Sequence, residues 1–173
     1  MRRHSLFVDK VYEKFALWRW FQQQGVERFA WIDAQHRLDW QHDHAAFLEL
    51  ARLAQYDWGA AWAEESWRTV DRELTRLEDD ARGNGFRVAT LTFPVRYQVY
   101  AATREDSPQK TFAALAQKHG FSNLDLLPLY KAHAGEEIFF DWCHPTPTMN
   151  RMIGAAVADF LRDDVKQVRA AHE

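Results

Sequence analysis

Apolar residues recur at every third or fourth position in several stretches of this chain, the spacing that gathers side chains on one face of a helix. The pattern predicts five helices, over roughly 6 to 24, 60 to 81, 108 to 119, 130 to 134 and from about 149 onward. The last is the most regular, with apolar residues at Met149, Met152, Ile153, Ala156, Val157, Phe160 and Leu161. No such period runs from 26 to 44, so we expect a long loop or an irregular cap there.

Two short stretches have the character of strands. Phe86–Pro94 is short and almost continuously apolar after Arg87, which is typical of a strand buried in a parallel sheet. Ile138–Phe140 predicts a second strand. Helices and strands in alternation favour a layered α/β architecture in one domain, 1–173, with an N-terminal helix and irregular loop at about 1–59. A stable parallel sheet usually has four or more strands, so the predicted sheet is incomplete.

Glycine, serine and proline mark the ends of two of these helices. Gly83 and Gly85 end the helix over 60 to 81. Ser107 followed by Pro108 predicts an N-cap and the first helical residue of the next helix, and Gly120 follows its last turn.

Composition narrows the classes of partner. The 173 residues carry a net charge of -3, so no basic stripe favours nucleic acid or an anionic membrane surface. No apolar run is long enough for a signal peptide or a membrane span. Cys143 is the only cysteine, which excludes an intrachain disulfide. We therefore expect a cytoplasmic protein, unless an upstream segment directs it elsewhere. Eight tryptophans are many, and we assign six of them to the core, namely Trp18, Trp20, Trp31, Trp40, Trp58 and Trp62.

The segment with the clearest chemistry precedes the last helix. Asp141 stands three residues before His144, and Pro145 follows. A carboxylate this close to an imidazole can fix its tautomer and stabilise its cation, as in the last two members of a serine-hydrolase triad. The alternative is a structural pair, in which Asp141 caps backbone amides and His144 is merely solvated.

A nucleophile for this pair is not evident. Cys143 adjoins His144, but neighbouring side chains on an extended segment point to opposite faces, so we expect an inert buried thiol. None of the serines lies in a glycine-flanked nucleophile turn: Ser5, Ser66, Ser107 and Ser122. Ser5 is the least excluded of the four.

Three blocks together resemble the closing section of an SGNH (GDSL-type) hydrolase, over about 62 to 161. The first is Asp-x-x-His-Pro at 141–145, followed by Thr-Pro and Asn150. The second is the strand ending in Phe93-Pro94, after a helix that contains Trp67-Arg68-Thr69. The third is Leu124–Pro128. The family's Gly-Asp-Ser nucleophile block and its Gly-x-Asn-Asp block do not occur in this chain.

The resemblance implies a three-layer α/β/α, flavodoxin-like sheet that is N-terminally incomplete and helix-rich. It implies His144 as general base and Asp141 as the residue that orients it. The expected function is hydrolysis of an ester or acyl group of a carbohydrate or lipid, by this chain or by a larger protein of which it is the C-terminal part. The alternative is a non-catalytic interaction protein or a degenerate fragment derived from such a hydrolase.

Other candidate residues have weaker support. Arg96, Tyr97 and Gln98 follow the strand 86–94 at the end where ligands gather in open α/β sheets, so they are expected to line a substrate groove or to form an ordinary polar connection. A polar loop holds possible zinc ligands, namely His36, Asp39, His42, Asp43 and His44. Their spacing matches no established site, so we expect a solvated loop, no metal and no cofactor.

The incomplete sheet also predicts association. The strand 88–93 would keep an unpaired edge, and such edges recruit another chain. We therefore expect a homodimer joined through the exposed sheet edge.

Overall fold

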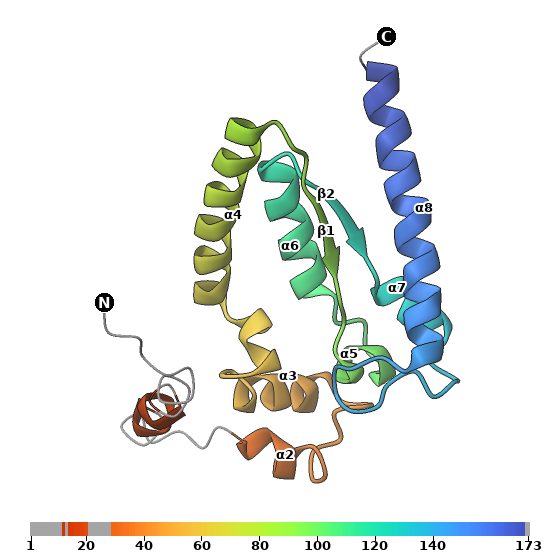
Figure 1. The fold of residues 1–173 in the computed structure, drawn as a ribbon. Coiled ribbons are helices and arrows are strands. Elements are labelled where there is room, and N and C mark those ends of the chain that lie inside the picture. The colour runs from red at the N-terminus through yellow and green to blue at the C-terminus, as the bar shows by residue number, and fades with distance from the viewer. Residues whose placement is uncertain (1–11, 13, 21–28, 172–173) are drawn as a thin grey trace.

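The computed structural model describes residue 12 and residues 14–20 and 29–171 of the chain (Figure 1). Their fold is a helix-rich α/β arrangement around one small sheet. The sheet holds two parallel strands, β1 (Ala89–Thr92) and β2 (Ser122–Asp125), with Ala89 opposite Ser122 and Thr92 opposite Asp125. In the described residues neither strand pairs with a third, so the incomplete, flavodoxin-like sheet that the resemblance implies stays a prediction.

The second strand is not the one that the sequence predicted. The segment 138–140 makes only an isolated antiparallel bridge, between Phe139 and Pro145. The strand that pairs with β1 is the polar segment Ser122–Asp125. Its Asn123 accepts hydrogen bonds from the hydroxyls of Thr90 and Thr92 at 3.0 and 3.1 Å. Side chains that bond across the pair satisfy their polar groups within the sheet, so β2 does not need the apolar run used to identify strands.

Helices lie on both sides of this sheet (Figure 1). On one side are α4 (Glu64–Asn84) and α6 (Ser107–Lys118), which share a small core of Leu74, Ala116 and Phe121. On the other side is the long α8 (Pro147–Ala171), next to the short α7 (Leu127–Ala132). Their core holds Leu126, Tyr130, Ile138, Met149 and Ile153. The apolar stripe predicted for the last helix therefore faces the interior at its start, through Met149 and Ile153, whereas Leu161 farther along is 42% exposed.

Helix ends follow the predictions in part. Gly85 ends α4 with φ of 69°, and Gly120 follows α6 with φ of 70°. The expected N-cap of α6 is wrong, because Asp106 occupies that position. Ser107 is the first helical residue, and its hydroxyl donates to the Glu105 carboxylate.

Within the described residues, the N-terminal third of the chain contains more helix than the sequence predicted. Residues 12 and 14–20 are helical, and the rest of the helix predicted over 6 to 24 lies outside the described residues. The segment expected to be a loop contains α2 (Ala30–Ala34). After it come α3 (His44–Leu53) and the 3-10 helix η1 (Trp58–Trp62), which replaces the first turn of the helix predicted from residue 60.

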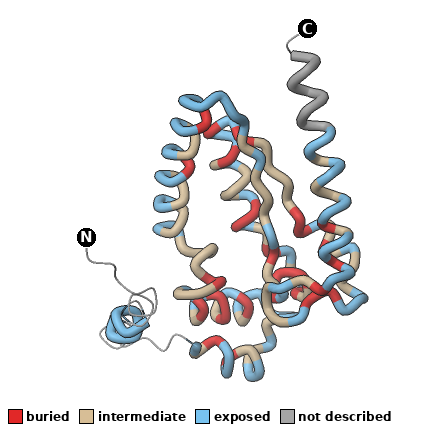
Figure 2. Tube along the Cα trace, viewed as in Figure 1, coloured by how far each residue is buried: buried red, intermediate tan, exposed pale blue. Residues whose placement is uncertain are grey.

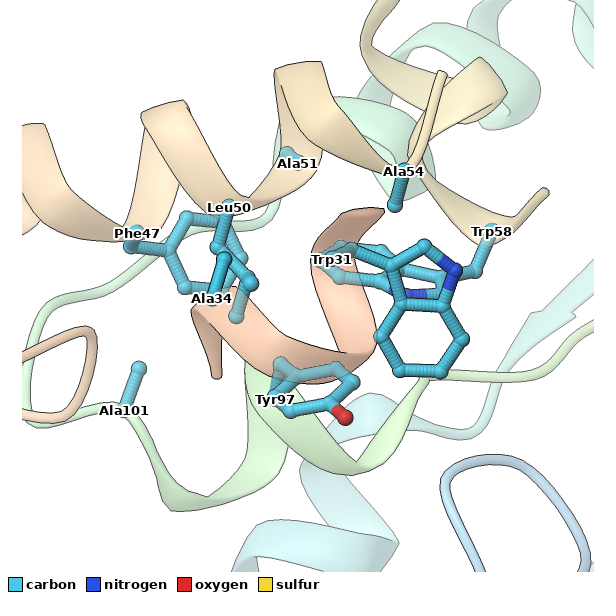
Figure 3. Close-up of a cluster of buried hydrophobic side chains, with 9 residues drawn as sticks. All are labelled: Trp31, Ala34, Phe47, Leu50, Ala51, Ala54, Trp58, Tyr97 and Ala101. Atoms are coloured by element: carbon cyan, nitrogen blue, oxygen red, sulfur yellow. The ribbon is translucent and has the colours of Figure 1, made fainter. Parts of the chain in front are cut away.

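The elements α2, α3 and η1 surround an aromatic core, in which Trp31, Phe47, Trp58 and Tyr97 are buried (Figure 3). The prediction of a core position was wrong for Trp18 and Trp20, which are 57% and 40% exposed. The ring of Trp58 stacks on Tyr97 at 4.8 Å, and Trp31 meets Trp58 edge-on at 6.1 Å. Tyr97 belongs to α5 (Arg96–Tyr100), the helix that follows β1. Many of the buried residues lie at the end of the molecule formed by α3, α5 and α7, where β1 also ends, and others lie along α4 and α6 (Figure 2).

Candidate functional site

The turn Asp141–His144 lies between the core and the start of α8. Its two flanks are joined, because the Phe140 amide donates to the His144 carbonyl at 2.9 Å and the Thr146 amide to the Ile138 carbonyl at 3.0 Å. The segment on each side is anchored by a fully buried residue, Ile138 before the turn and Met149 after it. The turn is therefore a loop closed on itself and fixed on a packed core.

The Asp141 carboxylate holds this turn through both of its oxygens. Oδ1 accepts from the backbone amides of Cys143 and His144, each at 2.8 Å. Oδ2 lies 2.7 Å from Nδ1 of His144. The sequence left two roles open for Asp141, capping backbone amides or orienting His144, and the Asp141 side chain makes both kinds of contact.

The negative charge of Asp141 determines which ring nitrogen of His144 carries the proton in the neutral imidazole. Partial burial acts to raise the pKa of Asp141, but the bonds from the two amides and from the His144 ring outweigh it and lower the pKa to about 2. An ionised carboxylate only accepts hydrogen bonds, so Nδ1 carries the proton. In the neutral ring Nε2 then holds the basic lone pair. The His144 side chain is 72% exposed, and the described residues give Nε2 no hydrogen-bond partner.

No described serine is bonded to His144. Ser66 lies in α4, Ser122 in β2, and the Ser107 hydroxyl is held by Glu105. Within the part of the chain that the structure describes, the hydrogen bonds of the His144 ring go to Asp141 and Cys143. Ser5, the candidate least excluded by sequence, lies outside the described residues.

Cys143 is placed differently from the expectation. Its Sγ lies 3.5 Å from Nδ1 of His144, so the two neighbouring side chains lie on the same side. The rule of opposite faces fails because the backbone turns here instead of remaining extended. Partial burial, together with the carboxylates of Asp141 and Asp57, raises the pKa of the Cys143 thiol to about 11. The group is half-buried instead of fully buried, and it is protonated at neutral pH, which makes it a poor nucleophile.

The predicted groove residues lie on α5, and they have different surroundings. Arg96 is exposed, and its backbone amide donates to the Trp142 carbonyl at 2.8 Å, which joins the start of α5 to the Asp141–His144 turn. Tyr97 is buried, and its hydroxyl donates to Gln35 at 2.6 Å. Burial raises the pKa of Tyr97 to about 12. Arg96 thus lies next to the turn, whereas the Tyr97 ring belongs to the aromatic core.

Gln98, the third of these residues, lines a cavity of about 220 Å³. It is buried and paired with Gln109, the two amides donating to each other's carbonyl oxygens at 2.8 and 3.1 Å. Five of the twelve residues that line the cavity are aromatic, namely Trp58, Trp62, Trp67, Phe93 and Phe112. The cavity adjoins the carboxyl end of β1, where parallel sheets commonly bind ligands. The sequence did not single out Gln109, because a glutamine inside an amphipathic helix carries no local signal.

The polar loop before α3 does not gather a zinc site. His42 pairs with Asp39 at 2.8 Å, whereas His44 reaches Glu105 at 2.8 Å. Asp43 is the N-cap of α3 and accepts from the Ala45 amide. Within the described residues, one group of three potential metal ligands is found, and it consists of Asp141, Cys143 and His144.

Comparisons with family models, with curated proteins and with solved structures find no match to this chain. In the part of the chain that the structure describes, no helix combines the length and apolar character needed to cross a membrane.

Proposed function

We propose that this chain carries the general-base part of an acyl ester hydrolase of SGNH type, with His144 as the base and Asp141 as the residue that orients it. One observation carries the proposal: Asp141 binds Nδ1 of His144 at 2.7 Å while two backbone amides hold the same carboxylate. The ring is thereby fixed in the tautomer that presents a basic Nε2 to solvent.

The chemistry requires a hydroxyl that the His144 ring can deprotonate. Nε2 takes the proton as the hydroxyl oxygen attacks the ester carbonyl, and the imidazolium that forms is stabilised by Asp141. The same proton then goes to the leaving alkoxide, which restores the neutral ring. Where the nucleophile is a serine, Nε2 next activates a water molecule in the same way, and this water releases the acyl group as the acid and restores the serine. The attacking hydroxyl is water or a serine outside the described residues, with Ser5 as the candidate in this chain.

The residues around the turn favour a substrate ester that has an apolar part. Phe140, directly before Asp141, is 67% exposed. Arg96 lies at the start of α5, against the turn, and its guanidinium carbon is 5.6 Å from the centre of the Tyr100 ring. An exposed aromatic ring next to the turn is suited to packing against the apolar part of such an ester.

Hydrolysis of a short-chain p-nitrophenyl ester tests the proposal. General-base catalysis contributes roughly 10²- to 10⁴-fold, so His144→Ala should lower kcat/KM by at least about 100-fold. Asp141→Asn should also lower it, because the amide can bind the wrong tautomer. The matched control is His42→Ala, which removes an exposed histidine from another carboxylate pair three residues apart. Equal rates for wild type and His144→Ala would refute the assignment.

Ser5→Ala decides between the two sources of the hydroxyl. With serine as nucleophile, the wild-type protein should release a burst of p-nitrophenol that the variant lacks. With water as nucleophile, both proteins should show the same steady rate and no burst.

A second function, binding of another chain without catalysis, is favoured by the sheet. The outer edges of β1 and β2 have no partner strand among the described residues, and a two-stranded sheet is marginal by itself. An added strand would stabilise the sheet, and it could come from a second copy or from another protein. This function would be favoured over the first if the protein self-associates and if none of the variants named above shows a reduced rate of ester hydrolysis.

A further inference from the structure

The side chains of the Asp141–His144 turn have a property that the hydrolase proposal does not use. Cys143 adds a sulfur to the carboxylate and the imidazole, and one ligand atom from each of the three residues lies within 4.8 Å of the others. Carboxylate, thiolate and imidazole are the three ligand types that proteins use for zinc. We propose that Asp141, Cys143 and His144 bind a zinc ion through three ligands, with the fourth position open to solvent.

Distances within the turn fit this coordination. Zinc bonds of about 2.3 Å to sulfur and 2.0–2.1 Å to nitrogen, at a tetrahedral angle, hold the two ligand atoms about 3.5 Å apart. Sγ of Cys143 lies 3.5 Å from Nδ1 of His144. Oδ2 of Asp141 lies 2.7 Å from the same nitrogen, which is hydrogen-bond distance. The ion would replace the bridging proton and separate these two atoms by roughly another 0.6 Å.

The backbone of the turn is already arranged for binding. Oδ1 of Asp141 stays bonded to two amides, so Oδ2 can turn to a metal while the carboxylate keeps its orientation. Such bonds behind a ligand are what holds metal-binding carboxylates in place. The indole of Trp142 lies 5.7 Å from Trp31, which ties the middle of the turn to the aromatic core. Little chain entropy remains to be lost when the ion binds.

Charge also favours a cation here. The Asp141 carboxylate places a negative charge among the ligand atoms, with Oδ2 2.7 Å from Nδ1 of His144. A bound zinc ion displaces the thiol proton, because its charge stabilises the thiolate. The proton on Nδ1 of His144 moves to Nε2, so binding releases one proton in total.

This tautomer change connects the site with the proposed hydrolase without depending on it. With zinc on Nδ1, Nε2 carries a proton and can no longer act as a base. Zinc binding and ester hydrolysis would therefore exclude each other at His144. The metal site is nevertheless tested without any ester, so its failure and the failure of the hydrolase proposal are separate results.

The test is a metal titration of the untagged full chain. Cobalt serves as an optical probe for zinc, since a cysteine thiolate bound to cobalt gives a charge-transfer band in the near ultraviolet. One equivalent of cobalt should produce this band, and zinc should abolish it by displacement. Calorimetry with zinc should give one site per chain and the release of one proton, seen as a heat that varies with the buffer.

Variants separate this site from weak surface binding. Cys143→Ser should remove the cobalt band and weaken zinc binding by at least about tenfold, since even indirect contacts to a metal ligand are worth 10- to 100-fold. His144→Ala should weaken binding by a similar factor. His42→Ala and His133→Ala are the matched controls, because each removes a histidine that pairs with a carboxylate at 2.8 Å without a thiol. Both should bind zinc as the wild type does.

Two results would overturn the proposal. One is a Cys143→Ser protein, with an unchanged circular dichroism spectrum, that binds zinc as tightly as the wild type. The other is an equal loss of affinity in His42→Ala, which would show binding at scattered histidine–carboxylate pairs.

Discussion

Gly59 provides a sharp test of how the N-terminal elements pack. It lies in η1, directly against the end of α3, and its amide donates to the Ala54 carbonyl at 3.0 Å. A Cβ atom added at Gly59 would lie 1.9 Å from the Ala51 carbonyl oxygen and 2.8 Å from the Ala54 carbonyl carbon. Both obstacles are backbone atoms of a helix end, so no side chain can rotate away to make room.

The magnitude of the effect of Gly59→Ala follows from these contacts. Contacts of a Cβ below 3.0 Å are essentially not found, so η1 and α3 must separate by about 1.1 Å. This movement stretches the bond from Gly59 to Ala54, worth about 1 kcal/mol. It also displaces Trp58 from its stacked position on Tyr97, and such repacking typically costs 1–3 kcal/mol. We expect a loss of about 3 kcal/mol in the free energy of unfolding, or roughly 6–12 °C in Tm.

Gly83→Ala is the matched control, with the opposite sign expected. Gly83 lies near the end of α4, and an added Cβ meets nothing within 4 Å. Alanine in a helix is more stable than glycine by about 0.5–1 kcal/mol, so this variant should melt slightly higher than the wild type. Thermal and urea unfolding, followed by tryptophan fluorescence, measure both. A Gly59→Ala protein as stable as the wild type would show that η1 does not pack on α3 as described.

Two further predictions concern the helices and the sheet. His119 has a side chain 4% exposed, and its hydrogen bonds to Glu78 and Asp71, formed at 2.8 and 2.7 Å, raise its pKa above the ordinary value. A raised pKa means that the protonated ring stabilises the fold below about pH 6.5, and this stabilisation is lost as the pH rises through the folded-state pKa. His119→Gln should therefore lower the free energy of unfolding by about 1–3 kcal/mol at pH 6 and by clearly less at pH 9. An equal loss at both pH values would refute the ionic role of His119. Sedimentation should show concentration-dependent dimers, because the two-stranded sheet leaves strand edges that can pair with a second copy; a stable monomer at high micromolar concentration would contradict the prediction.

The long amphipathic helices were evident from the sequence, because the helical period is a local property, whereas α2, α3 and α5 were not predicted. The helices over 60 to 81, 108 to 119 and from 149 appear as α4, α6 and α8, with changes of a few residues at their ends. The strands were harder to assign. β1 has an apolar sequence and was found, whereas β2 depends on Asn123 bonding to residues more than 30 positions earlier in the chain. A pairing between distant segments leaves no period in the sequence of either one.

In the candidate site, too, one contact was predictable from the sequence and another was not. Asp141 and His144 are three residues apart in a proline-flanked turn, so their sequence alone was sufficient to predict the contact that the structure contains. The position of the Cys143 side chain depends on the backbone path of the turn. The rule that neighbouring side chains point to opposite faces holds for extended chains, so it wrongly placed Cys143 on the side away from His144. The third member of the group was therefore visible only in three dimensions.

What the sequence by itself determined is the set of local features: the amphipathic helices, the glycines that end two of them, and the pairing of Asp141 with His144. The tertiary structure alone decided which segments lie together, namely β2 beside β1, the aromatic core between α2, α3 and α5, and the cavity at the end of β1. The physical reason is that local features arise from torsions and hydrogen bonds among residues a few positions apart. Packing instead depends on the burial of surfaces that distant parts of the chain bring together.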